Sequence, residues 1–146
     1  MKLLCFLARR FAWESFSQTL DDADQAPELL AGAVENALVV WLHAEACDEE
    51  PEARKRAFKQ TLKHVKWLAN KRERKDIVLH SFTHLGGATA EAGFARAFLV
   101  ELDERLTSTG YRVRRTPFGW FCSWELAAEG ESLAKVWKEI GPRASD

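Results

Sequence analysis

Residues 37–44 are Ala-Leu-Val-Val-Trp-Leu-His-Ala, a run of apolar and β-branched side chains. Such a run is typical of a strand that is buried on both faces of a parallel or mixed sheet. Pro51 then predicts the start of a helix, because proline suits the first helical position and acidic residues precede it at the positive end. The helix is predicted to end near Asn70, and a second buried strand is predicted over residues 76–82. This β-α-β order indicates an α/β fold.

The segments on either side complete one domain. Before the central run, two strands over residues 2–7 and 11–16 are predicted with a tight turn at 8–10. They are followed by a loop over 17–32, which can include a helical turn. After it, the predicted elements are a helix over 89–107, strands over 111–115 and 120–126, a short helix from Ser132 through Ile140, and a fraying tail over 141–146. The order predicts a single-domain α/β sandwich of a mixed sheet with helices, over residues 1–146.

The composition is that of a globular domain. The 146 residues are 47% hydrophobic and 29% charged, with a formal net charge of -1, which argues against disorder and fibrous repeats. No apolar run approaches the roughly 18 residues of a membrane span, and the start of the chain lacks the apolar region of a signal peptide. We therefore expect a cytoplasmic protein that does not contact a membrane.

The cysteines give no sign of a metal site. Cys5, Cys47 and Cys122 are scattered and have no metal-binding spacing, so they are expected to be reduced thiols. The sequence also contains no Walker loop, dinucleotide fingerprint or serine nucleophile elbow. Neither a metal nor a cofactor is therefore expected.

Charge is segregated along the chain. Residues 21–52 contain ten acidic residues and no Lys or Arg, whereas residues 54–75 contain ten basic residues and one Glu. Two interpretations are open: the basic helix face is solvated and pairs with the acidic segment, or it follows the phosphates of a nucleic acid. The candidates for phosphate contacts are Arg54, Lys55, Lys59, Lys63 and Lys66.

The segment Ser-Phe-Thr-His-Leu-Gly-Gly at residues 81–87 lies between a predicted strand and a predicted helix, where open α/β sheets bind ligands. Gly86 and Gly87 allow close backbone approach to an anion, although the same residues can serve only to turn the chain. His84 is the candidate for proton transfer, because imidazole titrates near neutrality. Cys122 lies between two tryptophans, which suits core packing; a nucleophilic pair with His84 is the alternative.

Several short motifs, taken in order, resemble one known family. They are Phe-Thr-His-Leu at 82–85, Gly-Tyr-Arg-Val at 110–113 leading to Thr-Pro-Phe-Gly-Trp at 116–120, and Gly-Glu-Ser-Leu-Ala at 130–134. Together with residues 34–51 they resemble the editing domain of archaeal-type threonyl-tRNA synthetase. The resemblance implies a D-aminoacyl-tRNA deacylase-like fold, a dimer, and hydrolysis by a bound water of serine that is wrongly esterified to threonine tRNA. The implied adenosine and aminoacyl site comprises Ala44, Ser81, Thr83 and His84, with Phe121 and Cys122 opposite.

Three positions depart from the pattern of that family. Phe121-Cys122 stands where archaeal members carry Tyr-Lys, Lys135 stands where they carry Glu, and Gly86-Gly87 stands where they carry serines. In the family that the chain resembles, the lysine that is missing here orients the water and rejects threonine. Lys135, on the predicted last helix, is the candidate to supply an ammonium group in its place.

Two functions are predicted. The first is a freestanding deacylase that hydrolyses a misacylated tRNA in trans, because the chain ends where a synthetase catalytic core would begin. The alternative is a catalytically inactive module with the same fold, which binds tRNA or partners threonyl-tRNA synthetase. The missing lysine favours the second function, and the retained His84 turn favours the first.

Overall fold

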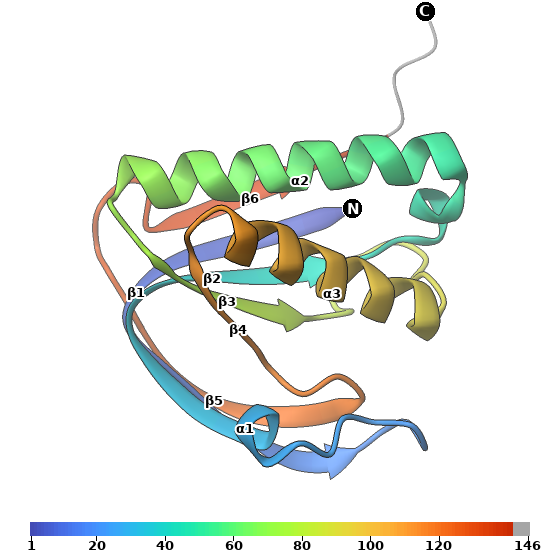
Figure 1. Cartoon of the computed structure of the whole chain (residues 1–146), viewed down its shortest axis with the longest axis horizontal. Coiled ribbons are helices and arrows are strands. Elements are labelled where there is room, and N and C mark those ends of the chain that lie inside the picture. Colours follow the sequence, from blue (N-terminus) through green and yellow to red (C-terminus); the bar gives the residue numbers. More distant parts are fainter. Residues whose placement is uncertain (142–146) are drawn as a thin grey trace, which may run out of the picture.

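A single mixed sheet organises the molecule (Figure 1). The computed structural model describes residues 1–141. Its elements are β1 (Lys2–Gln18), α1 (Pro27–Leu30), β2 (Ala31–His43), the 3-10 helix η1 (Ala46–Glu49), α2 (Pro51–Lys71), β3 (Asp76–Ser81), α3 (Ala92–Ser108), β4 (Arg112–Arg115), β5 (Trp120–Ala128) and β6 (Lys135–Glu139). The strand order is β4-β3-β2-β1-β5, and β6 also pairs with β1. The predicted fold class, a single-domain α/β sandwich of a mixed sheet with helices, is confirmed.

The predicted β-α-β unit is present at the centre of the sheet. β2 and β3 are parallel, β3 and β4 are parallel, and α2 and α3 are the two crossover helices. Pro51 begins α2 as predicted, and the Glu50 side chain accepts a hydrogen bond from the backbone N–H of Ala53 at 2.9 Å. α3 begins at Ala92, three residues later than predicted, and the Gly110 backbone has a φ of 99° after its end.

β1 is one long strand, so the prediction of two strands with a turn is wrong. Its first half, from Lys2 to Phe6, pairs with β6, and its second half, from Ala8, pairs with β5. The register with β5 shifts between Ala8 and Arg10, and Arg9 and Arg10 are both exposed. A bulge of this kind lets two consecutive polar side chains reach solvent without ending the strand. The two consecutive basic residues, Arg9 and Arg10, are therefore part of a bulged strand and not of a turn.

The second half of the sheet curls away from the helices (Figure 1). Residues 17–32 are predicted as a loop that can include a helical turn, and α1, Pro27–Leu30, is such a turn. The ends of the predicted loop are wrong, because β1 extends to Gln18 and β2 starts at Ala31. β5 therefore pairs along the far half of β1 and reaches back to the aromatic face of β2 and β3. This curl brings Trp124 of β5 to a ring-centroid distance of 4.5 Å from Trp41 of β2.

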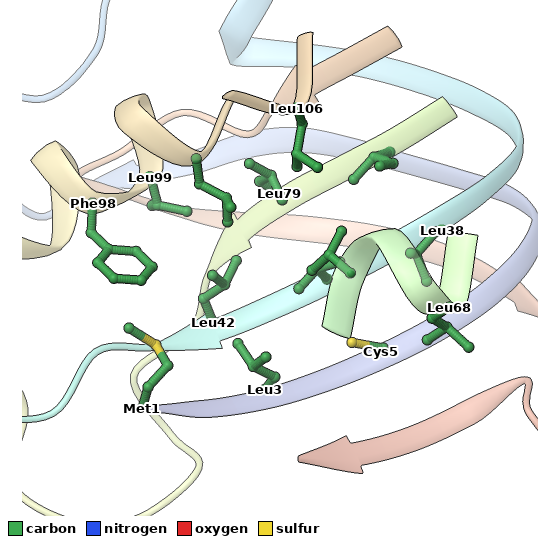
Figure 2. Close-up of a cluster of buried hydrophobic side chains, with 14 of the residues drawn as sticks. Met1, Leu3, Cys5, Leu38, Leu42, Leu68, Leu79, Phe98, Leu99 and Leu106 are labelled. Carbon is green, nitrogen blue, oxygen red and sulfur yellow. The ribbon is translucent and has the colours of Figure 1, made fainter. Parts of the chain in front are cut away.

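The main core lies between the sheet and the two long helices (Figure 2). Leu3 and Cys5 of β1, Leu38 of β2 and Leu79 of β3 point to that side, since alternate strand residues share a face. The helices complete it with buried apolar side chains, among them Leu68 of α2 and Phe98, Leu102 and Leu106 of α3. No helix within residues 1–141 is long and apolar enough to cross a bilayer.

The last element is a strand, and the predicted helix from Ser132 is wrong. β6 pairs antiparallel with the first half of β1, with Val136 opposite Cys5 and Lys135 opposite Phe6. The pattern around Val136 fits a short helix or a strand equally well, and the free edge of β1 selects the strand. The predicted tail over 141–146 lies outside the described residues except for Gly141, which follows β6.

Candidate active site

The carboxyl end of β3 and the start of β5 face each other across a cavity of about 290 Å³. The cavity is lined by His80, Ser81, Phe82, His84, Trp120, Phe121, Cys122 and Trp124. Four residues of the predicted site, Ser81, His84, Phe121 and Cys122, are therefore brought together although they are far apart in sequence. Trp120 also lines this cavity.

A second cavity of about 210 Å³ adjoins the first and shares Ser81 and Trp120 with it. Thr83 lines this second cavity, together with the segment at the start of α3 and the turn before β5. Ala44 lines neither cavity; it is buried, and its carbonyl accepts a hydrogen bond from the N–H of Ala90 at 3.0 Å. Ala44 thus fixes the backbone behind the site.

The turn Thr-Pro-Phe-Gly at 116–119 positions the β5 side of the cavity. Asp24, from the acidic segment, accepts a hydrogen bond from the Phe118 N–H at 2.8 Å with its carboxylate and one from the Trp120 indole at 2.8 Å with its carbonyl. Gly119 has a φ of 85°, and a Cβ atom there would lie 2.9 Å from the Ala23 backbone. Only glycine fits this contact, so the motif is required for the shape of the site.

Aromatic rings form the back wall of the cavity. The ring of Phe82 lies 4.8 Å from Trp41, 5.5 Å from Trp124 and 5.1 Å from His84, measured between centroids. Phe121 is 58% exposed and Trp124 is 37% exposed, so both present open ring faces at the entrance. A flat heterocycle such as a nucleobase fits such surfaces, because any π face can stack there.

His80 lies at the base of the cavity, a position that the sequence analysis did not select. Burial lowers the pKa of His80 to about 4, and its Nδ1 is 2.7 Å from the Thr116 hydroxyl. The imidazole is therefore neutral at pH 7 and is a fixed polar group below the aromatic wall. The sequence does contain a signal for this position of His80. Alternate residues of a strand share a face, so His80 lies on the same side as Phe82, which directly follows β3.

We expect His80 to make the protein less stable in acid. The unfolded chain binds a proton at His80 with an ordinary pKa near 6.5, and the folded chain does so only near pH 4. The contribution of His80 to the free energy of unfolding is thus complete above pH 6.5. It falls by about 2–3 kcal/mol as the pH decreases toward 4. Urea unfolding at pH 7.5 and pH 4.5 should show this loss, and His80→Gln should reduce it. An equal loss in His80→Gln would assign the acid sensitivity to other groups.

His43 holds the turn after β3. The Leu85 N–H donates to His43 Nδ1 at 3.3 Å, so the ring proton lies on Nε2 and is directed to the Thr89 hydroxyl at 3.0 Å. Burial lowers the pKa of His43, which favours this neutral form. Both ends of the turn that carries His84 are therefore fixed to one buried imidazole.

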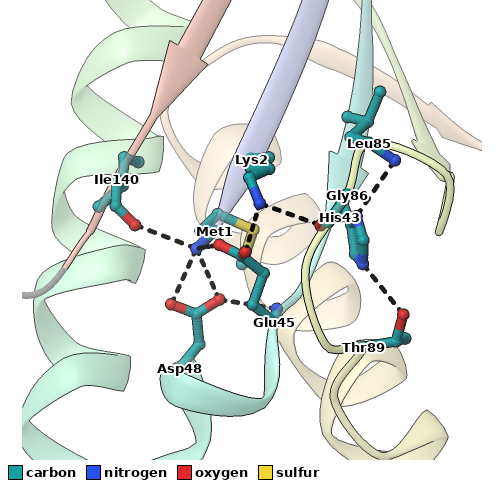
Figure 3. A network of polar contacts seen from close by, with 9 residues as sticks. All are labelled: Met1, Lys2, His43, Glu45, Asp48, Leu85, Gly86, Thr89 and Ile140. Carbon is teal, nitrogen blue, oxygen red and sulfur yellow. Dashed lines mark hydrogen bonds and ion pairs between the residues drawn. The ribbon is translucent and has the colours of Figure 1, made fainter.

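A network of charges anchors the same turn from below (Figure 3). The Lys2 ammonium donates to Glu45 Oε1 at 2.6 Å and to the Gly86 carbonyl at 3.0 Å. The Met1 amino group donates to Glu45 Oε2 at 2.8 Å. Burial alone would raise the pKa of Glu45, but the hydrogen bonds from Lys2 and Met1 outweigh it and lower the pKa. Gly87, with a φ of 82°, passes so close that a Cβ atom would lie 2.5 Å from Glu45 Oε1.

Possible metal ligands occur in the same network. Glu45, Cys47 and Asp48 place one ligand atom each within 4.8 Å of one another. Both carboxylates already bind ammonium groups, Glu45 that of Lys2 and both of them that of Met1. The positive charges that neutralise these carboxylates are therefore the ammonium groups of Met1 and Lys2.

The two candidates for catalytic side chains outside the turn differ in position. Cys122 lines the cavity, and burial raises the pKa of its thiol to about 11, so the thiol is neutral at pH 7. Lys135 is exposed on β6, does not line either cavity, and donates to the Glu129 carbonyl at 3.2 Å. The structure thus places Cys122 in the cavity that His84 also lines, whereas Lys135 lies on β6, which pairs with the other end of the same edge of β1.

Within residues 1–141, the acidic segment pairs with one basic residue of α2, Lys55. Arg54 pairs with Glu101 of α3, and Lys55 pairs with Glu52 of its own helix. Within residues 1–141, Lys59, Lys63 and Lys66 form no ion pair. The acidic residues bind elsewhere, for example Asp22 with Arg96. Three of the five predicted phosphate-binding side chains therefore remain available.

Comparison with known proteins agrees with this geometry. Residues 1–140 match the model of the archaea-specific editing domain of threonyl-tRNA synthetase. The threonine–tRNA ligase of Methanopyrus kandleri is 30% identical over 147 residues, which covers 100% of this chain and 23% of the ligase. That of Thermofilum pendens is 29% identical over 143 residues, 97% of this chain and 23% of the ligase.

A solved structure is similar as well. The c-Myc DNA Unwinding Element Binding Protein matches with a TM-score of 0.68 and 15% identity, over 97% of this chain and 100% of that chain, which shows the fold. The chain spans about a quarter of the length of the ligases that it matches. The family resemblance seen in the ordered motifs is confirmed over nearly the whole sequence. The chain belongs to the archaea-specific editing domains of threonyl-tRNA synthetase.

Proposed function

We propose that this domain is an aminoacyl-tRNA deacylase that hydrolyses the ester of a misacylated tRNA supplied in trans, with seryl-tRNA(Thr) as its substrate. The observation that carries the proposal is the single cavity that joins Ser81 and His84 to Phe121 and Cys122. The membership of the chain in an editing-domain family supports the same reaction. Editing is needed because one methyl group separates serine from threonine and gives only about 1–3 kcal/mol of discrimination in a pocket.

The terminal adenosine would stack at the entrance of the cavity. Phe121 offers an exposed ring, and Trp120 lies between the two cavities. The aminoacyl group would then extend past Ser81 toward Thr83, whose side chain lines the smaller cavity. A volume of about 210 Å³ there suits a small polar amino acid.

Hydrolysis would proceed by direct attack of water. The oxygen of a bound water attacks the ester carbonyl carbon, and its proton passes to His84. The bond between that carbon and the ribose oxygen breaks, and the ribose oxygen takes a proton to become a hydroxyl. Backbone N–H groups of Gly86 and Gly87 would face the developing oxyanion, since the turn is fixed by His43 and Lys2. Cys122 serves as a neutral wall in this scheme and Lys135 takes no part in it.

Assembly and location are part of the proposal. Phe16 is 80% exposed, and aromatic side chains of this kind are enriched where proteins associate. We propose a homodimer that acts in the cytoplasm and that meets threonyl-tRNA synthetase through their common tRNA.

A second candidate is a module that binds tRNA without hydrolysing it. One observation favours it: the cavity holds the neutral thiol of Cys122 at the position of the lysine that the family resemblance implies. In this function the same aromatic entrance would hold the terminal adenosine, and the ester would persist.

The two candidates are separated by the fate of the ester. Purified protein would be incubated with seryl-tRNA(Thr), threonyl-tRNA(Thr) and a D-aminoacyl-tRNA, and loss of the labelled amino acid would be followed against buffer alone. We expect loss of the seryl ester, with the threonyl ester at least about tenfold slower. Loss of another ester instead would change the substrate. Persistence of all three esters, with tRNA still bound, would support the binding module.

A further inference from the structure

A basic groove runs between α2 and β6, away from the cavity of the candidate active site. Two joined hollows of about 540 and 680 Å³ form it and share Gln60 and Lys63. The first also contains His64, Trp67 and Lys138. The second continues along α2 to Lys59, Arg56 and Lys55 and ends at Glu52 and Gly141. We refer to these residues as the α2 groove.

Positive charge in the α2 groove is regularly spaced. Lys55, Lys59, Lys63 and Trp67 recur at steps of four residues, so they lie in one row with a rise of about 6 Å per step. Among residues 1–141, Arg56, Lys59, Lys63 and Lys138 form no ion pair. The one acidic member, Glu52, is bound to Lys55. A chain of phosphates complements such a row, whereas a polypeptide has no comparable repeat of negative charge.

The far end of the row is aromatic. Trp67 is 45% exposed, and His64 stacks on it at 5.9 Å with an angle of 29° between the rings. Burial lowers the pKa of His64, and Lys138 lowers it further, so the imidazole is neutral. Its buried Nε2 has no hydrogen-bond partner within the described residues. A flat ring that stacks on Trp67 would thus lie beside a neutral imidazole and near the ammonium groups of Lys63 and Lys138.

The near end of the α2 groove lies close to the His84 turn. Gly141 follows Ile140, whose carbonyl accepts a hydrogen bond from the Met1 amino group at 3.0 Å. Met1 binds Glu45, Glu45 binds Lys2, and Lys2 binds the Gly86 carbonyl. Four consecutive polar contacts therefore connect the end of the groove with the turn that carries His84 (Figure 3).

We propose that the α2 groove binds single-stranded RNA, with one base stacked on Trp67 and the backbone along Lys63, Lys59 and Lys138. The combination of a basic track and an aromatic platform is the usual means of holding an unpaired strand. A duplex cannot present an unstacked base to Trp67, so the groove discriminates against it. The inference rests on the proposed function in one respect: the RNA strand is taken to be an unpaired segment of tRNA.

The test measures binding of a fluorescein-labelled, unstructured RNA of about 12 nucleotides by fluorescence anisotropy. Trp67→Ala is expected to weaken binding about tenfold, because stacking of one base contributes that much affinity. Lys63→Ala and Lys138→Ala should each weaken binding and reduce its salt dependence. Trp137→Ala is the matched control: Trp137 has nearly the same exposure, lies on β6 and does not line the groove. Arg9→Ala is the control for charge, since Arg9 is exposed on β1.

Several results would overturn the inference. They are unchanged affinity in Trp67→Ala, an equal loss in Trp137→Ala, or equal affinity for the same RNA annealed to its complement. The outcome is distinct from that of the deacylation assay. Hydrolysis of seryl-tRNA with no effect of Trp67→Ala on the RNA would refute the groove alone, and RNA binding through Trp67 with all esters intact would refute the hydrolase alone.

Discussion

Replacing Asp48 by alanine is expected to lower the free energy of unfolding by about 3–4 kcal/mol. The Asp48 side chain is 5% exposed and binds the Met1 amino group through both carboxylate oxygens, at 2.8 and 3.0 Å. The amino group itself is fully buried. Without Asp48, this ammonium keeps only Glu45 and one carbonyl as partners, and Glu45 is already shared with Lys2. A buried charge that loses half of its compensation is among the most costly defects in a folded protein.

The same carboxylate also holds the local backbone. Asp48 Oδ2 accepts a hydrogen bond from the Glu45 N–H at 2.9 Å, and the two side chains cap η1 reciprocally. Alanine therefore removes a cap as well as a charge, which adds to the loss. Because Glu45 positions Lys2 and Lys2 holds the Gly86 carbonyl, we expect the His84 turn to loosen together with the fold.

Urea unfolding at pH 7 measures the effect. Glu49→Ala is the matched control, because Glu49 is exposed in the same short helix, and it should change the free energy of unfolding by less than about 0.5 kcal/mol. Asp48→Asn separates charge from shape: it keeps the volume and should still be clearly destabilised. Equal midpoints for Asp48→Ala and Glu49→Ala would mean that the amino group of Met1 is hydrated and that the network does not stabilise the fold.

The elements that the sequence predicted well are those with local signals. Pro51 with the acids around it defines the start of α2, and a run of β-branched residues defines β2. β6 and the bulge in β1 have no such signal. The strand around Val136 exists because the first half of β1 offers an unpaired edge, and Arg9 and Arg10 stay in β1 because pairing with β2 continues on its other side. Both depend on contacts between residues at least 25 positions apart.

The residues of the candidate site were likewise predicted where the sequence carries a local signal and missed where it does not. His84, Gly86 and Gly87 were found because a strand, a turn and a helix start follow one another along the chain. His80 was missed, since a histidine within a buried strand is more often structural, and only the curl of β5 over β3 makes it the base of a cavity. The anchoring network was missed because it joins the first two residues to residues 45 and 48. The sequence thus predicts the residues of the turn but not what holds them in place.

Replacing His84 by alanine is expected to lower the rate of seryl-ester hydrolysis by about 100-fold, the lower range for loss of a general acid or base. His84 is exposed at the rim of the cavity, and its ring packs edge-on against Phe82 at 5.1 Å. This contact holds the imidazole at the cavity that Phe121 and Cys122 also line. No other side chain of the cavity combines exposure to solvent with an imidazole ring, because His80 is buried.

The measurement is the single-turnover rate of ester loss between pH 5 and pH 9, with His84→Gln and Glu91→Ala alongside. Glutamine retains hydrogen bonding but does not titrate, so His84→Gln should be slow and should lose the acid limb of the pH profile. Glu91 is exposed beside the start of α3 and is expected to leave the rate unchanged. A wild-type rate in both His84 variants would rule out His84 as the acceptor of the proton from water. The role of His84 would then be limited to holding the substrate, and its replacement would raise KM while leaving kcat as it was.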